Sequence, residues 1–146
     1  CFQSRRLPFA PFDSKARTAR GDRRGGQDRV YATPGKEGDL WIAAFDGLYH
    51  GLPGEAFVPL DKVRRIYAFG FGKAAPGSDY PSLYLAGIVN GISGFFRSDD
   101  AARGWVRIND DDHQYGLVLH ISGDPKRYGR VYVGSHGRGI VYADPY

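Results

Sequence analysis

The stretch that decides the fold is SLYLAGIVNGISGFFR, residues 82–97. It joins an alternating apolar run to a turn with Asn and Gly, and it closes on a second apolar run with two aromatic residues. The same order recurs in DLWIAAFDGLYH at residues 39–50 and in RVYVGSHGRGIVYA at residues 130–143. Because alternation with a period of two is typical of β-strands and Asn-Gly of tight hairpins, each copy predicts a β-hairpin.

The spacing of the copies indicates what the hairpins build. The aromatic residues Trp41, Tyr84 and Tyr132 hold the same place in each copy, and they are 43 and 48 residues apart. A period of about 40 to 50 residues with short strands is typical of a four-stranded β-propeller blade, whereas ankyrin and tetratricopeptide units are shorter and helical. The 21 glycines and the aromatic content of 14% also favour short strands and tight turns. We therefore predict an all-β fold, a β-propeller fragment, with these three aromatic residues in the core.

The expected strands fall into three units, residues 30–62, 63–110 and 111–146. They are residues 30–33, 40–44, 47–49 and 57–60 in the first unit; 65–70, 83–87, 94–97 and 105–108 in the second; and 117–121, 131–135 and 139–142 in the third. This makes about two and three-quarter four-stranded blades, whereas closed propellers use about four to eight. We expect the chain to be the tail of a larger propeller or a piece that needs partners, since alone it would expose sheet edges.

Residues 1–29 differ from the rest in composition. They carry a net charge of +5, whereas residues 30–146 carry −1. We expect a basic irregular segment or an eroded hairpin of a preceding blade. A nucleic-acid binder should carry its basic face on the folded part of the chain, so no nucleic-acid partner is expected. No apolar run is long enough to span a membrane, and no membrane partner is expected.

The only cysteine is Cys1. This excludes an intrachain disulfide and a cysteine-based metal site, and we expect neither a metal nor a cofactor. A chain that begins with Cys rather than Met is expected to be a truncated piece, and a lipid-modified Cys1 is the alternative.

The turn RSDDAARGW, residues 97–105, resembles the Asp-box, Ser-x-Asp-x-Gly-x-Thr-Trp, of sialidase-like and sortilin-like propellers. Ser98, Asp100 and Trp105 match the motif, while Ala102 and Gly104 replace its Gly and Thr. An aspartate in a hairpin accepts hydrogen bonds from the N–H groups of the turn, and the aromatic ring packs beneath the loop. We predict a structural role for the motif in preference to a catalytic one.

In addition to the Asp-box, the chain resembles the C-terminal part of the family 74 glycoside hydrolases, the xyloglucanases and oligoxyloglucan-cleaving enzymes. The matching stretches are PGKEGDLWIA, FGFGKAAPGSDYPSLYLAG, FFRSDDAARGWVRINDDDHQYG and ISGDPKRYGRVYVGSHGRGIVYADP. They keep their order from about residue 30 to residue 145. The string INDDDHQYG, followed by YGRVYVG and GRGI, is more specific than the Asp-box.

The resemblance implies a secreted, extracellular enzyme of two seven-bladed propellers with a cleft for xyloglucan, a branched β-1,4-glucan. Such enzymes invert the anomeric centre with two aspartates far enough apart to admit a water molecule. In the family both lie upstream of this region, so no catalytic residue is expected here. The expected partners are a xyloglucan oligosaccharide and either the remaining blades of a longer chain or a second copy. The alternative function is a non-catalytic, sortilin-like Asp-box module that binds protein or glycan.

Residues 110–113, DDDH, form the densest polar cluster. A general acid or a metal site would use such groups, but neighbouring acids in a loop point in different directions and one His lacks zinc-site spacing. We favour a hydrogen-bonded connection between blades.

Contact with sugar is expected at His113, Gln114 and Tyr115, because aromatic faces stack on pyranose rings and amides bind hydroxyl groups. For Tyr115 the alternative is a cap on the propeller core. His136 and Arg138, in a tight Gly-containing turn, give a weaker signal for ligand contact.

Overall fold

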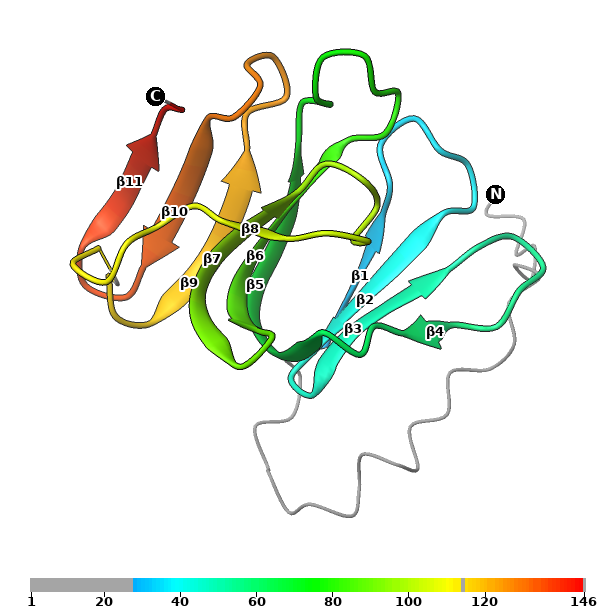
Figure 1. The fold of residues 1–146 in the computed structure, drawn as a ribbon, viewed down its shortest axis with the longest axis horizontal. Coiled ribbons are helices and arrows are strands. Elements are labelled where there is room, and N and C mark those ends of the chain that lie inside the picture. The colour runs from blue at the N-terminus through cyan, green and yellow to red at the C-terminus, as the bar shows by residue number, and fades with distance from the viewer. Residues whose placement is uncertain (1–27, 114, 146) are drawn as a thin grey trace, which may run out of the picture.

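A computed structural model describes residues 28–113 and 115–145, and within them the chain forms strands and turns but no helix (Figure 1). There are three antiparallel sheets. The first contains β1 (Arg29–Ala32), β2 (Leu40–Ala44), β3 (Gly47–Gly51) and β4 (Val58–Pro59). The second contains β5 (Val63–Gly72), β6 (Ser82–Val89), β7 (Ile92–Ser98) and β8 (Val106–Arg107). The third contains β9 (Val118–Gly123), β10 (Val131–Ser135) and β11 (Gly139–Ala143).

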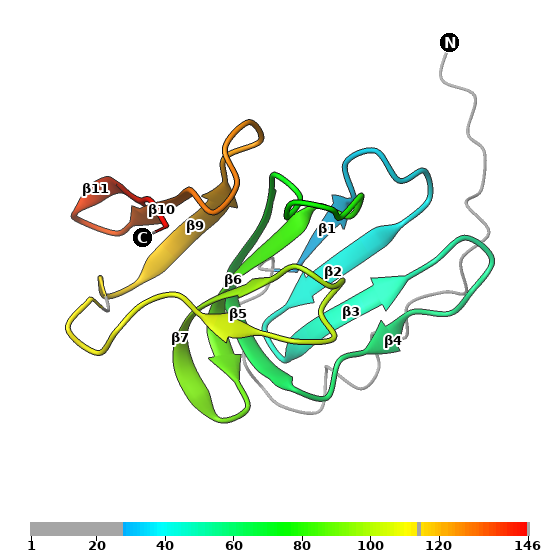
Figure 2. The ribbon, with the colours of Figure 1, turned by 45° about the horizontal axis from the view of Figure 1, so that its top comes forward.

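The eleven expected strands are all present, and the all-β propeller architecture is confirmed. Within each sheet the strands follow one another in sequence order, and the second sheet lies between the other two (Figures 1 and 2). The largest difference in boundaries is at β5, which extends two residues beyond the expected run at each end. At the C-terminal end the alternation weakens, because residues 70–72 are Gly, Phe and Gly.

The register shows that the sheets are copies of one unit. The aromatic residue of each copy pairs across the hairpin with an equivalent residue: Trp41 with His50, Tyr84 with Arg97, and Tyr132 with Tyr142. Trp41 and Tyr84 are 0% and 1% exposed, as expected of core residues. Tyr132 is only half-buried, so its placement in the core was wrong. The reason is positional, since Tyr132 lies on the side of the third sheet that faces away from the second.

Two apolar cores join the sheets. Trp41, Leu48, Phe69 and Leu85 are buried together between the first and second sheets. Tyr84, Phe95, Ile121 and Val133 are buried together between the second and third. Burying each such side chain stabilises the fold by about 1.5–3 kcal/mol. The two cores therefore hold the three sheets together, and they fix the position of the loops between them.

A close approach between the second and third sheets depends on glycine. Gly123 on β9 passes directly over the ring of Tyr84, and a Cβ atom on this glycine would lie 2.3 Å from Tyr84 Cε2. Gly72 on β5 meets the same ring, at 2.6 Å for the equivalent Cβ position. The absence of side chains at these two positions lets Tyr84 fill the space between the sheets.

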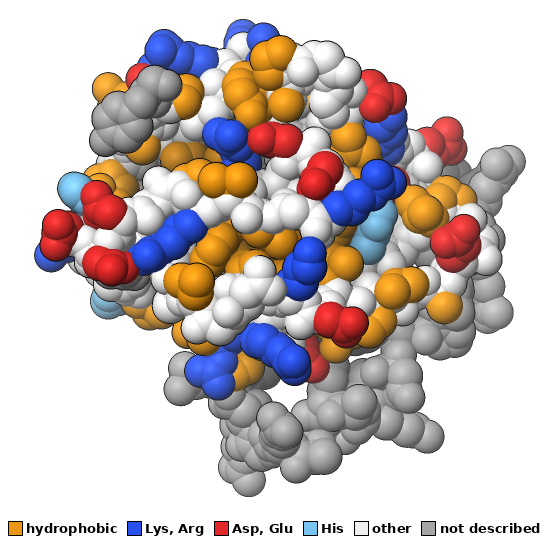
Figure 3. Space-filling view, viewed as in Figure 1, with side chains coloured by type: hydrophobic (Ala, Val, Ile, Leu, Met, Phe, Trp, Pro, Cys, Tyr) orange, Lys and Arg blue, Asp and Glu red, His pale blue; other side chains and the backbone are white. Residues whose placement is uncertain are grey.

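Basic and acidic side chains alternate over the face seen in Figure 3, without gathering into one basic area. The expectation for the basic leading segment lies almost entirely outside the described residues. None of the described residues forms a helix long and apolar enough to cross a membrane.

Candidate functional site

The predicted sugar-contact residues lie in the loop between β8 and β9, and Asn109 anchors this loop. Its Oδ1 accepts a hydrogen bond from the backbone N–H of Phe95 on β7, at 2.8 Å. Its Nδ2 donates to the carbonyl oxygens of Asp110 and His113, at 3.0 and 3.1 Å. One side chain thus ties the loop to the second sheet and holds its turn closed.

Asp110 and His113 form a local pair within this loop. The Asp110 carboxylate accepts the backbone N–H of His113 at 2.9 Å and lies 2.5 Å from its ring Nδ1. The hydrogen bond from the His113 ring, more than any other cause, holds the pKa of Asp110 below its usual value. Both side chains are more than half exposed. This arrangement matches a hydrogen-bonded connection, the interpretation that the sequence favours.

The neighbouring acid, Asp111, forms an ion pair with Arg107, with 2.6 Å between Asp111 Oδ1 and Arg107 Nη2. Within residues 28–113 and 115–145, no group of three or more His, Cys, Asp or Glu side chains is placed to hold a metal ion.

Tyr115 packs against the second core, and its contact with sugar stays a prediction. Its ring stacks parallel to that of Phe95, with centroids 6.1 Å apart and planes 3° from parallel, and it packs against the second core. The centroid of the His113 ring lies 6.0 Å from that of Tyr115, and the His113 side chain is more than half exposed. The structure therefore brings His113 and Tyr115 together, while Gln114 lies outside the described residues. The backbone of Tyr115 has a φ of +46°, which is uncommon for a bulky residue and is characteristic of functional or turn positions.

These residues line a cavity of about 530 Å³ between the second and third sheets. The polar part of its wall contains the arginines of β7 and β8, Arg97 and Arg107, together with Asn109 and Asp110. The apolar part contains Phe95, Tyr115 and Tyr142. Aromatic rings beside charged and amide groups are the composition that a sugar site requires.

Sequence reasoning missed Arg97, Arg107 and Tyr142. Arg97 pairs with Tyr84, the repeated aromatic residue, across β6 and β7. Its fixed position in the repeat could therefore have identified Arg97 from the sequence.

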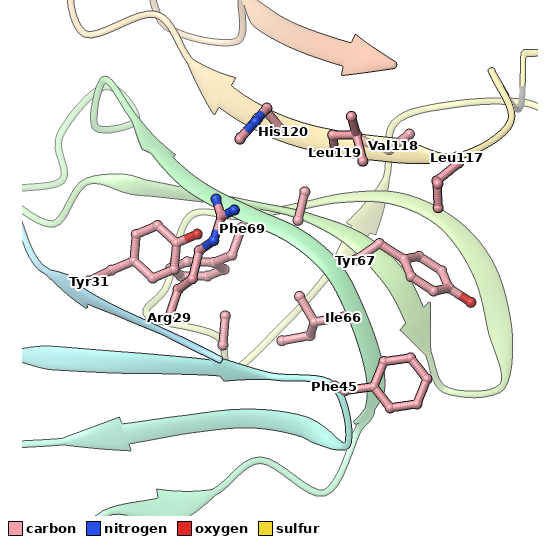
Figure 4. Close-up of a pocket in the computed structure, with 12 residues that line it drawn as sticks. Arg29, Tyr31, Phe45, Ile66, Tyr67, Phe69, Leu117, Val118, Leu119 and His120 are labelled. Atoms are coloured by element: carbon pink, nitrogen blue, oxygen red, sulfur yellow. The ribbon is translucent and has the colours of Figure 1, made fainter. Parts of the chain in front are cut away.

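A second cavity, of about 570 Å³, lies between the first strands of the three sheets (Figure 4). Its wall is largely apolar, with Ile66, Phe69 and Leu119 among its residues. Arg29 from β1 and His120 from β9 project into the space between the strands. With so few polar groups it matches a sugar less well than the cavity at His113 and Tyr115.

The turn of residues 98–105 is held by its own side chains. The Ser98 hydroxyl donates to Asp100 Oδ1 at 2.8 Å and accepts the backbone N–H of Ala102 at 2.9 Å. Asp100 Oδ1 also accepts the backbone N–H of Gly104 at 2.9 Å. Partial burial acts to raise the pKa of Asp100, but these hydrogen bonds outweigh it and hold the pKa below its usual value. Trp105 packs half-buried against the first core. Assignment of this turn to the Asp-box motif stays a prediction.

His136 and Arg138 are exposed in the turn between β10 and β11 and do not line the cavity at Tyr115.

The chain was compared with known proteins, and no family model matches it. It is 51% identical over 121 residues to a xyloglucanase of Acetivibrio thermocellus, a match that covers 81% of this chain and 14% of the relative. A xyloglucanase of a Paenibacillus species is also 51% identical over 121 residues, which covers 78% of this chain and 12% of that protein. An oligoxyloglucan-reducing end-specific xyloglucanase of Emericella nidulans is 40% identical over 119 residues, a match that covers 75% of this chain and 14% of that protein.

Solved structures agree with these matches. A family 74 glycoside hydrolase of Niastella koreensis has a TM-score of 0.75 and 38% identity, covering 81% of this chain and 18% of its own. A family 74 xyloglucanase of Xanthomonas campestris has a TM-score of 0.74 and 38% identity, and the match covers 88% of this chain and 18% of that one. The fold is therefore that of part of a β-propeller, in which each repeat of the sequence forms one antiparallel sheet. The chain belongs to glycoside hydrolase family 74, and it spans 14% of the length of the first curated relative.

Proposed function

We propose that the chain forms scaffold and part of the substrate cleft of a secreted, xyloglucan-active glycoside hydrolase. The observation that carries this proposal is the 51% identity over 121 residues to proteins named xyloglucanases. In this proposal the β-1,4-glucan backbone is cleaved with inversion, and the two aspartates that this requires lie outside the chain. The division into blades at residues 30–62, 63–110 and 111–146 is part of the same proposal.

Within this enzyme, His113, Gln114 and Tyr115 contact the sugar. Two features support this role: the exposed His113 ring, and the stack of Tyr115 on Phe95, which holds the tyrosine ring in one orientation at the cavity wall. A ring fixed in advance loses little conformational entropy when a pyranose packs on it. Arg97, which lines the same cavity, then provides donors for sugar hydroxyl groups.

The test is calorimetric titration of the 146-residue chain with a xyloglucan oligosaccharide, while the release of reducing ends is followed in parallel. Binding without hydrolysis is expected. The variant His113→Ala should weaken binding about five- to tenfold, the loss of one or two net hydrogen bonds or contacts. His136→Ala is the matched control, an exposed histidine in a turn that does not line the cavity, and it should bind as the parent does.

Hydrolysis by this chain would overturn the placement of the catalytic pair outside it. Equal binding by His113→Ala and the parent would overturn the sugar-contact role. Failure to bind xyloglucan, with retained binding of an unrelated glycan or a protein, would favour the sortilin-like alternative.

A further inference from the structure

The connection from β8 to β9 is longer than its counterpart from β4 to β5. Leu60 and Ile108 are equivalent, since each donates a backbone N–H to the third strand of its own sheet, at 2.9 and 2.8 Å. Ile66 and Val118 are equivalent in the next sheet, because each lies at the same irregularity in the register of its first strand. The chain takes six steps from Leu60 to Ile66 and ten from Ile108 to Val118, so the second connection is longer by four residues.

The added residues, within 109–117, are therefore not required to join one sheet to the next. In proteins built from repeats, insertions of this kind lie in loops on one face, which is often the face that binds a ligand. The added loop contains Asp110 and His113, and both line the cavity between the second and third sheets.

Asp110 attaches the side chain of His113 to this loop. One carboxylate oxygen, Oδ1, accepts the backbone N–H of His113 at 2.9 Å and also lies 2.5 Å from its ring Nδ1. Among the described residues, no lysine or arginine forms an ion pair with Asp110, and Arg107 is paired with Asp111 instead. The carboxylate of Asp110 therefore has no cation that competes with the histidine.

The charge of Asp110 determines which ring nitrogen of His113 carries the hydrogen. The hydrogen bond from the His113 ring is the main cause that holds the pKa of Asp110 below its usual value, so the carboxylate is ionised at neutral pH. An ionised carboxylate can only accept hydrogen bonds, and Nδ1 must therefore be the donor. In the neutral ring this leaves a free lone pair on Nε2, which makes Nε2 an acceptor.

This acceptor is available to a ligand. No described residue forms a hydrogen bond with Nε2, and the His113 side chain is 58% exposed at the wall that it shares with Tyr115. The cations that line the same cavity, Arg97 and Arg107, have donors only. A hydroxyl group both donates and accepts, so a wall with guanidinium donors and an imidazole acceptor can satisfy both of its functions.

We propose that Asp110 is a positioning residue, which holds His113 with its hydrogen on Nδ1 so that Nε2 accepts a hydrogen bond from a hydroxyl group of the bound saccharide. This inference rests on the proposed function, because the saccharide is the ligand assigned there to this cavity. Asp110 itself does not touch the ligand in this arrangement, and it acts only through the orientation and the tautomer of the His113 ring.

The position of the hydrogen can be read in the sugar-free chain by NMR correlation of the imidazole nitrogens with the ring C–H protons. The spectra are recorded at about pH 8, where an ordinary histidine is neutral, and the signals of His113 are those that His113→Ala lacks. A hydrogen on Nδ1 is expected in the parent. It should shift toward Nε2 in Asp110→Ala, whereas Asp110→Asn keeps an acceptor oxygen and should retain it on Nδ1. Asp111→Ala is the matched control, since this neighbouring carboxylate is paired with Arg107, and it should leave the His113 ring unchanged.

A double-mutant cycle tests the link to the ligand, by calorimetric titration with a xyloglucan oligosaccharide. Asp110→Ala should weaken binding about three- to fivefold, and Asp110→Asn should weaken it less. In the His113→Ala background, Asp110→Ala should have little further effect, because the ring through which it acts is already absent. In the parent, addition of the oligosaccharide should shift the Nε2 signal and leave the hydrogen on Nδ1.

Four outcomes separate the parts of this proposal. A hydrogen on Nε2 in the sugar-free parent would overturn the positioning role. Equal losses of affinity from Asp110→Ala in the parent and in the His113→Ala background would also overturn it, because the carboxylate would then act independently of the ring. An unchanged Nε2 signal in a chain that binds the oligosaccharide would overturn the acceptor role. A chain that binds no oligosaccharide, with its hydrogen on Nδ1, would overturn the proposed function and the acceptor role together, and it would still support the positioning of His113 by Asp110.

Discussion

The hydroxyl of Tyr80 lies 3.1 and 3.0 Å from the two carboxylate oxygens of Asp39, and this contact joins the second sheet to the first. Asp39 is 6% exposed and also accepts from the Thr33 hydroxyl at 2.7 Å. Tyr80 receives a hydrogen bond in turn from Trp41 Nε1 at 3.1 Å. A buried carboxylate is tolerated only where donors surround it. The contact therefore fixes the position of one sheet against the next.

Tyr80→Phe removes this contact and should lower the free energy of unfolding by about 1–3 kcal/mol, since Asp39 and Trp41 each lose a buried partner. Urea denaturation of parent and variant measures the difference. Stability equal to that of the parent would show that the remaining donors, Thr33 and His50, satisfy Asp39 alone.

Tyr84→Phe should have the opposite outcome and provides the matched comparison. The Tyr84 hydroxyl is buried and forms no hydrogen bond of full geometry with the described residues, although the backbone N–H of Gly129 acts on it from nearby. Its removal relieves the cost of an unsatisfied polar group, so the free energy of unfolding should stay the same or rise by up to about 1 kcal/mol. The same urea experiment measures it. A clear loss of stability would mean that the hydroxyl is hydrogen-bonded in solution.

Gly123→Ala tests the approach of β9 to the second sheet. The new Cβ would lie 2.3 Å from Tyr84 Cε2 and close to the backbone of Gly72, so the sheets must separate. We expect a loss of about 3 kcal/mol or more, at the upper end of the cost of overpacking. Gly134→Ala is the control on the neighbouring strand, because its Cβ would meet its nearest atom at an ordinary 3.5 Å. Equal melting temperatures for the two variants would contradict the close contact.

Ala101→Gly should stabilise the turn that Ser98 and Asp100 hold. Ala101 has a φ of +56°, which costs an alanine about 1–2 kcal/mol, whereas glycine adopts it freely. The added freedom of the unfolded chain offsets about 0.4–1 kcal/mol of this. A net gain of about 0.5–1 kcal/mol is expected. In the exposed strand residue Ala143 the same change should destabilise by about 0.5–1 kcal/mol. A loss in both variants would show that the turn stores no strain at Ala101.

The repeat, the strands and the strand order could be predicted from the sequence, because each depends on local alternation and on turns such as Asn90-Gly91. The contacts between sheets could not. Tyr80 meets Asp39 from 41 residues away, and no local pattern states which loop of one sheet reaches the next. The exposure of Tyr132 was mispredicted for the same reason, since its burial depends on a neighbouring sheet.

The candidate site was predicted only in part. The sequence pointed to His113 and Tyr115 because aromatic and polar residues are adjacent there, and the structure places both at one cavity. Arg97 and Arg107 join them only through the packing of β7 and β8 against the third sheet. The buried carboxylate of Asp39 was missed because nothing in the local pattern distinguishes it from a solvated turn residue.

The hydrogen bonds of Asp100 predict a specific loss of stability in acid. Its pKa in the folded chain lies below the ordinary 3.8. The ionised form is therefore favoured by folding, so its stabilisation is complete above the unfolded pKa and is lost as the pH falls through the folded one. Asp100→Asn keeps one acceptor oxygen but cannot titrate. The variant should be less stable than the parent at neutral pH, and the difference should shrink below about pH 4. Urea denaturation at a series of pH values measures this convergence. A difference between the two proteins that stays constant down to the lowest pH would mean that the Asp100 carboxylate has no preference for its ionised form in the folded turn.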